Sequence, residues 1–139
     1  MDRKSKLVFL IGNRRGNAVV EMALVLPILL LLVFGITEFG RAWMTVNVMH
    51  TASREGARIA VVSGPDVALV NSRVNQVMAA ANITPTSITV VGPDIADVVE
   101  RKVTVTVTAD FVVIPGKVLT MFEPVLPLSA STTMRAESF

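Results

Sequence analysis

Cysteine is absent from the 139 residues, which excludes disulfide bonds, thiol nucleophiles and cysteine-ligated zinc. His50 is the only histidine, and no acidic residue lies three or four positions away from it. Neither a Ser–His–Asp arrangement nor a histidine-based metal site is therefore indicated, and we expect His50 to face solvent. A glycine-rich phosphate loop and a pair of catalytic carboxylates are missing too. We expect a protein that is not an enzyme and needs no cofactor.

Positive charge is concentrated at the N-terminus. Residues 1–16 hold five basic residues against one acid, whereas the whole chain has a formal net charge of +2, so the remainder is net acidic. Binding to nucleic acid needs a basic patch on the folded part of a protein, and a nucleic-acid partner is excluded on that ground. A basic head before an apolar run instead indicates membrane topology, with the N-terminus in the cytoplasm.

A long apolar run follows the basic head. Residues 17–37 carry one charge, on Glu21. A helix of this length spans about 31 Å, which matches a hydrocarbon core of about 30 Å. Pro27 lies inside the run, and membrane helices tolerate proline, so we expect a mild kink and no break. A cleaved secretory signal peptide is disfavoured, because its apolar core is usually about 7–15 residues long and no small-x-small cleavage site follows.

The expected organisation has three parts. Residues 1–16 form a basic cytoplasmic leader, residues 17–37 a transmembrane helix in the lipid bilayer, and residues 38–139 a small extracytoplasmic α+β domain. The first part of that domain, residues 38–62, continues the helix, because Gly40 and Gly56 are its only weak points before Ser63-Gly64-Pro65.

The start of the apolar run carries a candidate processing site at Gly16 and Asn17. A glycine lets a protease bring its catalytic groups close to the backbone. Glu21 lies inside the apolar run, where a carboxylate is costly and needs a partner. If the chain is cut after Gly16, the new amine on Asn17 of a neighbouring subunit neutralises Glu21 and sets the subunit register. The alternative is that Glu21 lies at the cytoplasmic edge and pairs with Arg14 or Arg15.

Three sequence blocks follow one another along the first part of the chain: Arg15-Gly16 with VEMALVLP at 20–27, FGITEFGR at 34–41, and ASREGAR at 52–58. In this order they resemble the TadE-like family, the pseudopilins (minor pilins) of the bacterial tight-adherence, or Tad/Flp, pilus system. The resemblance implies cleavage after Gly16 by a prepilin peptidase and residence in the bacterial inner membrane with the C-terminal domain in the periplasm. It also implies participation in a pilus alongside other pilin-like subunits and the Tad assembly machinery. Met22 departs from the aromatic residue often found after the glutamate.

Beyond the apolar run, periodicity predicts two helices packed on a sheet. A stripe at alternating spacings of three and four marks the packed side of the first helix. Asp66 is the expected cap of a second helix over 67–81, with an apolar stripe of its own. The first stripe comprises Ala42, Val46, Met49, Ser53, Gly56 and Ala60. The second comprises Val67, Val70, Val74, Val77 and Ala81.

Strand signals at 87–91, 102–108 and 128–134 predict a three-stranded antiparallel sheet, a pilin-like arrangement. Val and Thr alternate over 103–108, so we expect the valines to be buried under a helix. Residues 111–126 read as a long apolar loop containing Phe122. Two interpretations of this loop stay open: an exposed contact patch, or a cover over one end of the sheet.

Charged residues on the first helix are candidates for contact with a partner. Arg54, Glu55 and Arg58 lie in one block, and an exposed Phe122 would add to them. The alternative is a salt-bridged helix face, which we favour for Glu55 and Arg58 as an i,i+3 pair like Glu38 with Arg41. Arg54 stays open between the two.

Three acids precede the long strand at Asp94, Asp97 and Glu100. They lack the spacing and the glycine of an EF-hand, so a solvated acidic turn is favoured over a calcium site.

Two further functions are weighed against a TadE-like pseudopilin. One is an uncleaved single-span accessory protein that binds another envelope component through its periplasmic domain. The other, an anchored enzyme, is disfavoured because no catalytic set is present.

Overall fold

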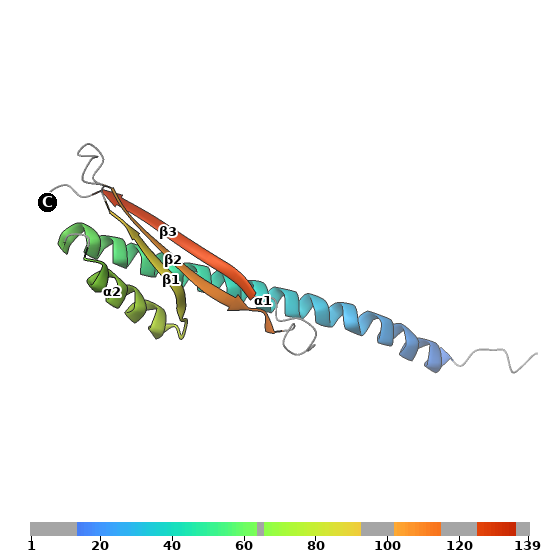
Figure 1. Cartoon of the computed structure of the whole chain (residues 1–139). Helices are drawn as coiled ribbons and strands as arrows, with labels where there is room; N and C mark the ends of the chain where they lie inside the picture. The colour runs from blue at the N-terminus through green and yellow to red at the C-terminus, as the bar shows by residue number, and fades with distance from the viewer. Residues whose placement is uncertain (1–13, 64–65, 93–101, 115–124, 136–139) are drawn as a thin grey trace, which may run out of the picture. The chain divides into compact units, whose positions relative to one another are not determined.

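The computed structural model describes residues 14–63, 66–92, 102–114 and 125–135. The elements follow in the order α1 (Arg14–Ser63), α2 (Val67–Ala80), β1 (Pro85–Val91), β2 (Lys102–Val112) and β3 (Val125–Arg135) (Figure 1). This order confirms the expected α+β class with a long N-terminal helix and a three-stranded antiparallel sheet. The chain divides into two compact units, Met1–Thr37 and Glu38–Phe139.

In the first unit, the structure describes only α1. The helix runs through Pro27 without a break, as expected. Its apolar side chains are exposed throughout, from Val19 at 70% to Ile36 at 64%. A helix with exposed apolar side chains on all sides is typical of a membrane span.

In the second unit, the sheet has the order β1-β2-β3, and both pairs are antiparallel. Val107 at the centre of β2 pairs with Ile88 on one side and with Ala130 on the other. The valines at 103, 105 and 107 are fully buried, as the alternation with threonine predicts. The predicted burial of the valine side of this strand is therefore confirmed.

The core lies between the sheet and the two helices. Gly56 of α1 is the closest meeting point: a Cβ there would lie 2.8 Å from Cγ2 of Val74 in α2 and 3.3 Å from Cγ1 of Val105 in β2. Arg41 lies over the ring of Phe111, further along β2. Since Gly56 meets residue 105 and Arg41 meets residue 111, α1 and β2 run antiparallel. The predicted stripe of α1 is buried from Met49 to Ala60.

One buried polar contact ties α1 to the edge of the sheet. The Ser53 hydroxyl is fully buried and lies 2.7 Å from the hydroxyl of Thr132 in β3. A buried hydroxyl needs such a partner, because leaving it unsatisfied costs about 1–3 kcal/mol.

The second helix begins at the predicted cap. The Asp66 carboxylate accepts hydrogen bonds from the backbone N–H groups of Ala68 and Leu69, at 2.9 and 3.4 Å. Val70, Val74 and Met78 are buried, whereas the prediction for Val67 is wrong. Val67 is the first residue of α2 and is 50% exposed, so the buried stripe of this helix starts one turn later, at Val70.

The strands are longer than the sequence predicts. β2 continues to Val112 and β3 already begins at Val125, so the predicted loop over 111–126 is too long at both ends. Pro127 pairs with Asp110 inside β3. A proline is tolerated there because β3 is an edge strand, one side of which needs no ladder hydrogen bonds. Phe122 and the acids Asp94, Asp97 and Glu100 lie outside the described residues.

Candidate functional site

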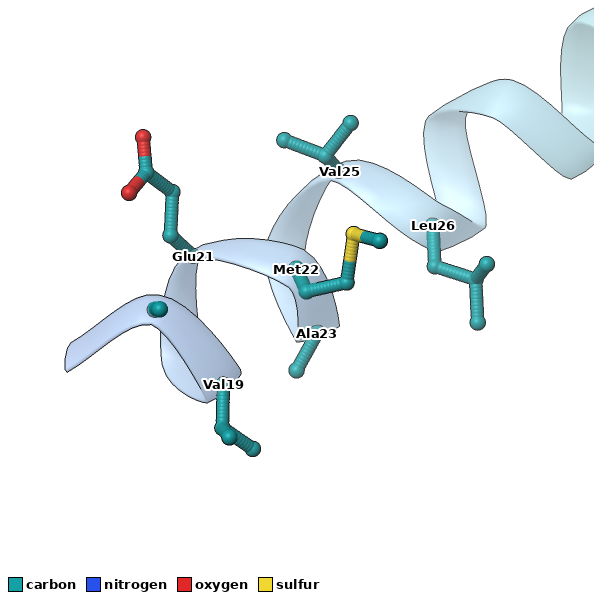
Figure 2. Close-up of a pocket in the computed structure, with 7 residues that line it drawn as sticks. Val19, Glu21, Met22, Ala23, Val25 and Leu26 are labelled. Carbon is teal, nitrogen blue, oxygen red and sulfur yellow. The ribbon is translucent and has the colours of Figure 1, made fainter. Parts of the chain in front are cut away.

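Glu21 is an exposed acid on an apolar helix surface. Its side chain projects to the same side of α1 as Val25, one turn further on, over a shallow hollow with an almost wholly apolar lining (Figure 2). Within the described residues, the Glu21 carboxylate makes no hydrogen bond and no ion pair. The site thus presents a carboxylate that lacks a counter-charge from the part of its own chain that the structure describes.

Gly16 and Asn17 are both exposed on the first turns of α1. A Cβ built on Gly16 would meet no atom within 4 Å. Packing within the described part of the chain therefore gives no reason for a glycine at this position. The side chains of Arg14 and Arg15, on which the edge interpretation of Glu21 depends, lie outside those described.

The charged block on the outer part of α1 differs from its prediction. Glu55 does not pair with Arg58: its Oε2 accepts a hydrogen bond from Nη2 of Arg73 in α2, at 3.1 Å. Glu55 lies at the boundary between the helices, where its side chain turns toward α2. Arg54 and Arg58 are exposed and form no ion pair with any described residue. These two arginines lie four residues apart, on one side of the helix.

The predicted pair between Glu38 and Arg41 is confirmed. Nη1 of Arg41 donates to both carboxylate oxygens of Glu38, at 2.8 and 2.9 Å. His50 is exposed, as expected. Among the described residues, no group of three or more His, Asp or Glu side chains is placed to hold a metal ion.

Sequence reasoning missed a cleft at the end of the sheet where β2 finishes. It has a volume of about 550 Å³ and is walled by α1, by the turn after α2 and by the end of β2. Charged residues of both signs, Arg41 and Asp110, line it. The two are 69 positions apart in sequence, so only the antiparallel course of α1 and β2 brings them together. The other polar residues of the lining are Thr45, Asn82, Thr84 and Thr86.

An exposed aromatic pair lies on α1, with one ring two residues before Arg41 of the cleft and the other two residues after it. The rings of Phe39 and Trp43 are stacked with centroids 6.3 Å apart. Phe39 is 70% exposed and Trp43 is 61% exposed.

The first helix is also where similarity to other proteins is found. A family model described as TadE-like protein matches residues 16–58. This segment belongs to the TadE-like family. No curated protein and no solved structure matches the chain. The TadE-like segment begins at Gly16 and contains Glu21, Arg54, Glu55 and Arg58, whereas α2 and the sheet lie outside it. The match over this segment supports a component associated with the Tad pilus, and α1 is long and apolar enough to cross a membrane.

Proposed function

We propose that the protein is a pseudopilin: a non-enzymatic subunit that is anchored in the membrane by residues 17–37, cleaved after Gly16, and incorporated into or priming a Tad pilus. The observation that carries this proposal is the position of Glu21. An exposed carboxylate follows an unpacked glycine by five residues, on an apolar helix of the TadE-like segment. A plain membrane anchor has no need of either feature.

The energetics explain why the two features belong together. A carboxylate at the centre of a membrane helix costs about 2.5–3.5 kcal/mol on insertion scales. Cleavage after Gly16 creates a positively charged amine on Asn17, at the same end of the helix as Glu21. When two subunits lie side by side, the amine of one neutralises the carboxylate of the other. The pairing sets the axial register of neighbouring helices, because any slip separates the charges.

The membrane anchor has two roles: it keeps subunits in the bilayer before assembly, and it provides the surface through which they pack in the pilus. Exposed apolar side chains hold each subunit in the bilayer, and the same side chains pack against neighbouring anchors when subunits leave the membrane. The basic leader keeps the N-terminus in the cytoplasm of a bacterial inner membrane, where a prepilin peptidase removes it. The second unit then lies in the periplasm.

The second unit offers contacts to other pilin-like subunits or to the assembly machinery. Arg54 and Arg58 are exposed, lie on one side of α1 and form no ion pair within the described ranges. They are the proposed contact residues. Glu55 is not, because Arg73 holds it within the fold. Phe122 stays a proposed contact from sequence alone.

The proposal is tested by deleting the gene for this protein in its native host. We expect deletion to abolish surface pili, measured as pilus protein in a sheared fraction and by electron microscopy, and expression of the full chain to restore them. A deletion strain that carries normal numbers of pili contradicts the function. A chain with residues 17–37 replaced by a different apolar span is the control: it should reach the membrane without restoring pili.

A further inference from the structure

The cleft beside Arg41 has the chemistry of a binding site for a small polar group with two opposite charges. Its volume of about 550 Å³ lies within the range of ligand pockets, about 300–1,000 Å³. Arg41 supplies a positive charge and Asp110 a negative one, yet the two do not form an ion pair with each other. Hydroxyl and amide side chains between them add neutral donors and acceptors.

Arg41 is held in place with part of its guanidinium left unused. Its Nη1 is bonded to Glu38, and the guanidinium lies 5.1 Å from the centre of the Phe111 ring. Phe111 is only 8% exposed, so its ring is held in place and supports the guanidinium of Arg41 from one side. The N–H groups on Nε and Nη2 of Arg41 make no hydrogen bond within the described ranges. They match the geometry of a phosphate, which arginine binds through two parallel N–H groups.

Asp110 is available for a cation. It is exposed at the end of β2, and its carboxylate makes no ion pair or hydrogen bond with any described residue. A ligand that carried only negative charge would be repelled by this carboxylate and by Glu38. A ligand with a phosphate and an ammonium group satisfies both Arg41 and Asp110.

The position of the cleft along α1 indicates where such a group is found. Arg41 follows Thr37, the last residue of the apolar run, by four residues, which is about 6 Å of helix. The headgroup layer of a bilayer is about 5–7 Å thick on each side of the hydrocarbon core. Trp43 is exposed half a turn further along α1, and tryptophan is enriched at that level of membrane proteins. This placement rests on the proposed membrane span.

We propose that the cleft binds the headgroup of a zwitterionic phospholipid that carries a primary ammonium, as in phosphatidylethanolamine. The free N–H groups of Arg41 and the hydroxyls of Thr84 and Thr86 bind the phosphate, and Asp110 accepts hydrogen bonds from the ammonium. The Thr45 hydroxyl takes no part, because it donates to the backbone carbonyl of Arg41. A quaternary ammonium donates no hydrogen bond, so a choline headgroup fits the site less well. The bound lipid fastens the second unit to the membrane surface until the subunit is extracted.

The test uses the full chain in nanodiscs made from equal amounts of phosphatidylethanolamine and phosphatidylglycerol. Lipids that stay bound to the protein are counted by native mass spectrometry after release into mild detergent. We expect phosphatidylethanolamine to be enriched about tenfold among retained lipids, since one charge-assisted hydrogen bond corresponds to roughly that factor. Asp110→Asn and Arg41→Gln should each remove most of the enrichment. Arg135→Gln, at an exposed arginine beside Lys102 at the opposite end of the sheet, should leave it unchanged.

Two further experiments distinguish a lipid ligand from a free small molecule, and failure of the headgroup site from failure of the proposed membrane span. Soluble glycerophosphoethanolamine at millimolar concentration should not displace the lipid; if it does, the ligand is a free small molecule and the lipid proposal is wrong. The proposed headgroup site is also wrong if the unchanged protein retains both lipids equally. It is wrong as well if Asp110→Asn keeps the full enrichment of phosphatidylethanolamine. Trp43 is the only tryptophan, so quenching of its fluorescence by brominated lipids tests the span separately. Quenching without enrichment refutes the headgroup site alone, whereas absence of quenching refutes the proposed anchor as well.

Discussion

Replacing Glu21 with alanine is expected to abolish incorporation of the protein into pili while leaving its insertion into the membrane intact. The substitution removes the one charge of residues 17–37, so insertion becomes easier. It also leaves the amine of the neighbouring subunit without a counter-charge and removes the register between helices. We expect the amount of protein in the sheared pilus fraction to fall by about tenfold or more. Membrane fractionation of the same cells should show an unchanged amount in the membrane.

Two variants separate the charge from other properties of the side chain. Glu21→Gln keeps the size and removes the charge, and it should fail as Glu21→Ala does. Val25→Ala changes a residue one turn away on the same side of α1, and it should assemble nearly normally. Normal assembly of both Glu21 variants would show that the carboxylate has no part in the register.

The fold of the second unit is expected to depend strongly on Gly56. A Cβ at this position would lie 2.8 Å from Cγ2 of Val74, and within 3.3 Å of methyl groups of Val70 and Val105. All three are buried, branched side chains with little room to move. Overpacking of a core typically costs about 1–3 kcal/mol, and Gly56→Leu adds several atoms beyond the Cβ. We therefore expect a loss of about 3 kcal/mol or more, measured by urea unfolding of the full chain in detergent.

Gly40 provides the matched control on the same helix. A Cβ there would meet nothing within 4 Å, so Gly40→Leu fits without strain. Because leucine is a better helix former than glycine by up to about 1 kcal/mol, this variant should be as stable as the original or slightly more stable. Equal losses in the two variants would mean that the close approach at Gly56 does not hold the helices and the sheet together.

Periodicity was enough to predict the parts of the fold in which one side of an element is buried. The alternation of valine and threonine in β2 places Val103, Val105 and Val107 in the core, where the structure has them. The stripe on α1 was predictable for the same reason, since a helix presents one side to a sheet. Asp66 was predictable because its carboxylate acts locally, on the first N–H groups of α2.

Contacts between elements could not be read from local patterns. Glu55 fits an i,i+3 pair with Arg58, yet it bonds Arg73 because α2 lies beside it. The start of β3 at Val125 was not predicted, because Pro127 suggests a loop. Proline is allowed there only because β3 is an edge strand. The cleft of Arg41 and Asp110 depends on the antiparallel course of α1 and β2, which no single segment encodes.

The N-terminus of the functional protein tests the proposed pairing most directly. Protein is recovered from sheared pili and from membranes of piliated cells, and its intact mass is measured together with the sequence of its first residues. Pairing between Glu21 and a cleaved terminus predicts a chain that begins at Asn17 and carries a free α-amine. A chain in assembled pili that still carries residues 1–16 would contradict the account, because no new amine would exist to neutralise Glu21.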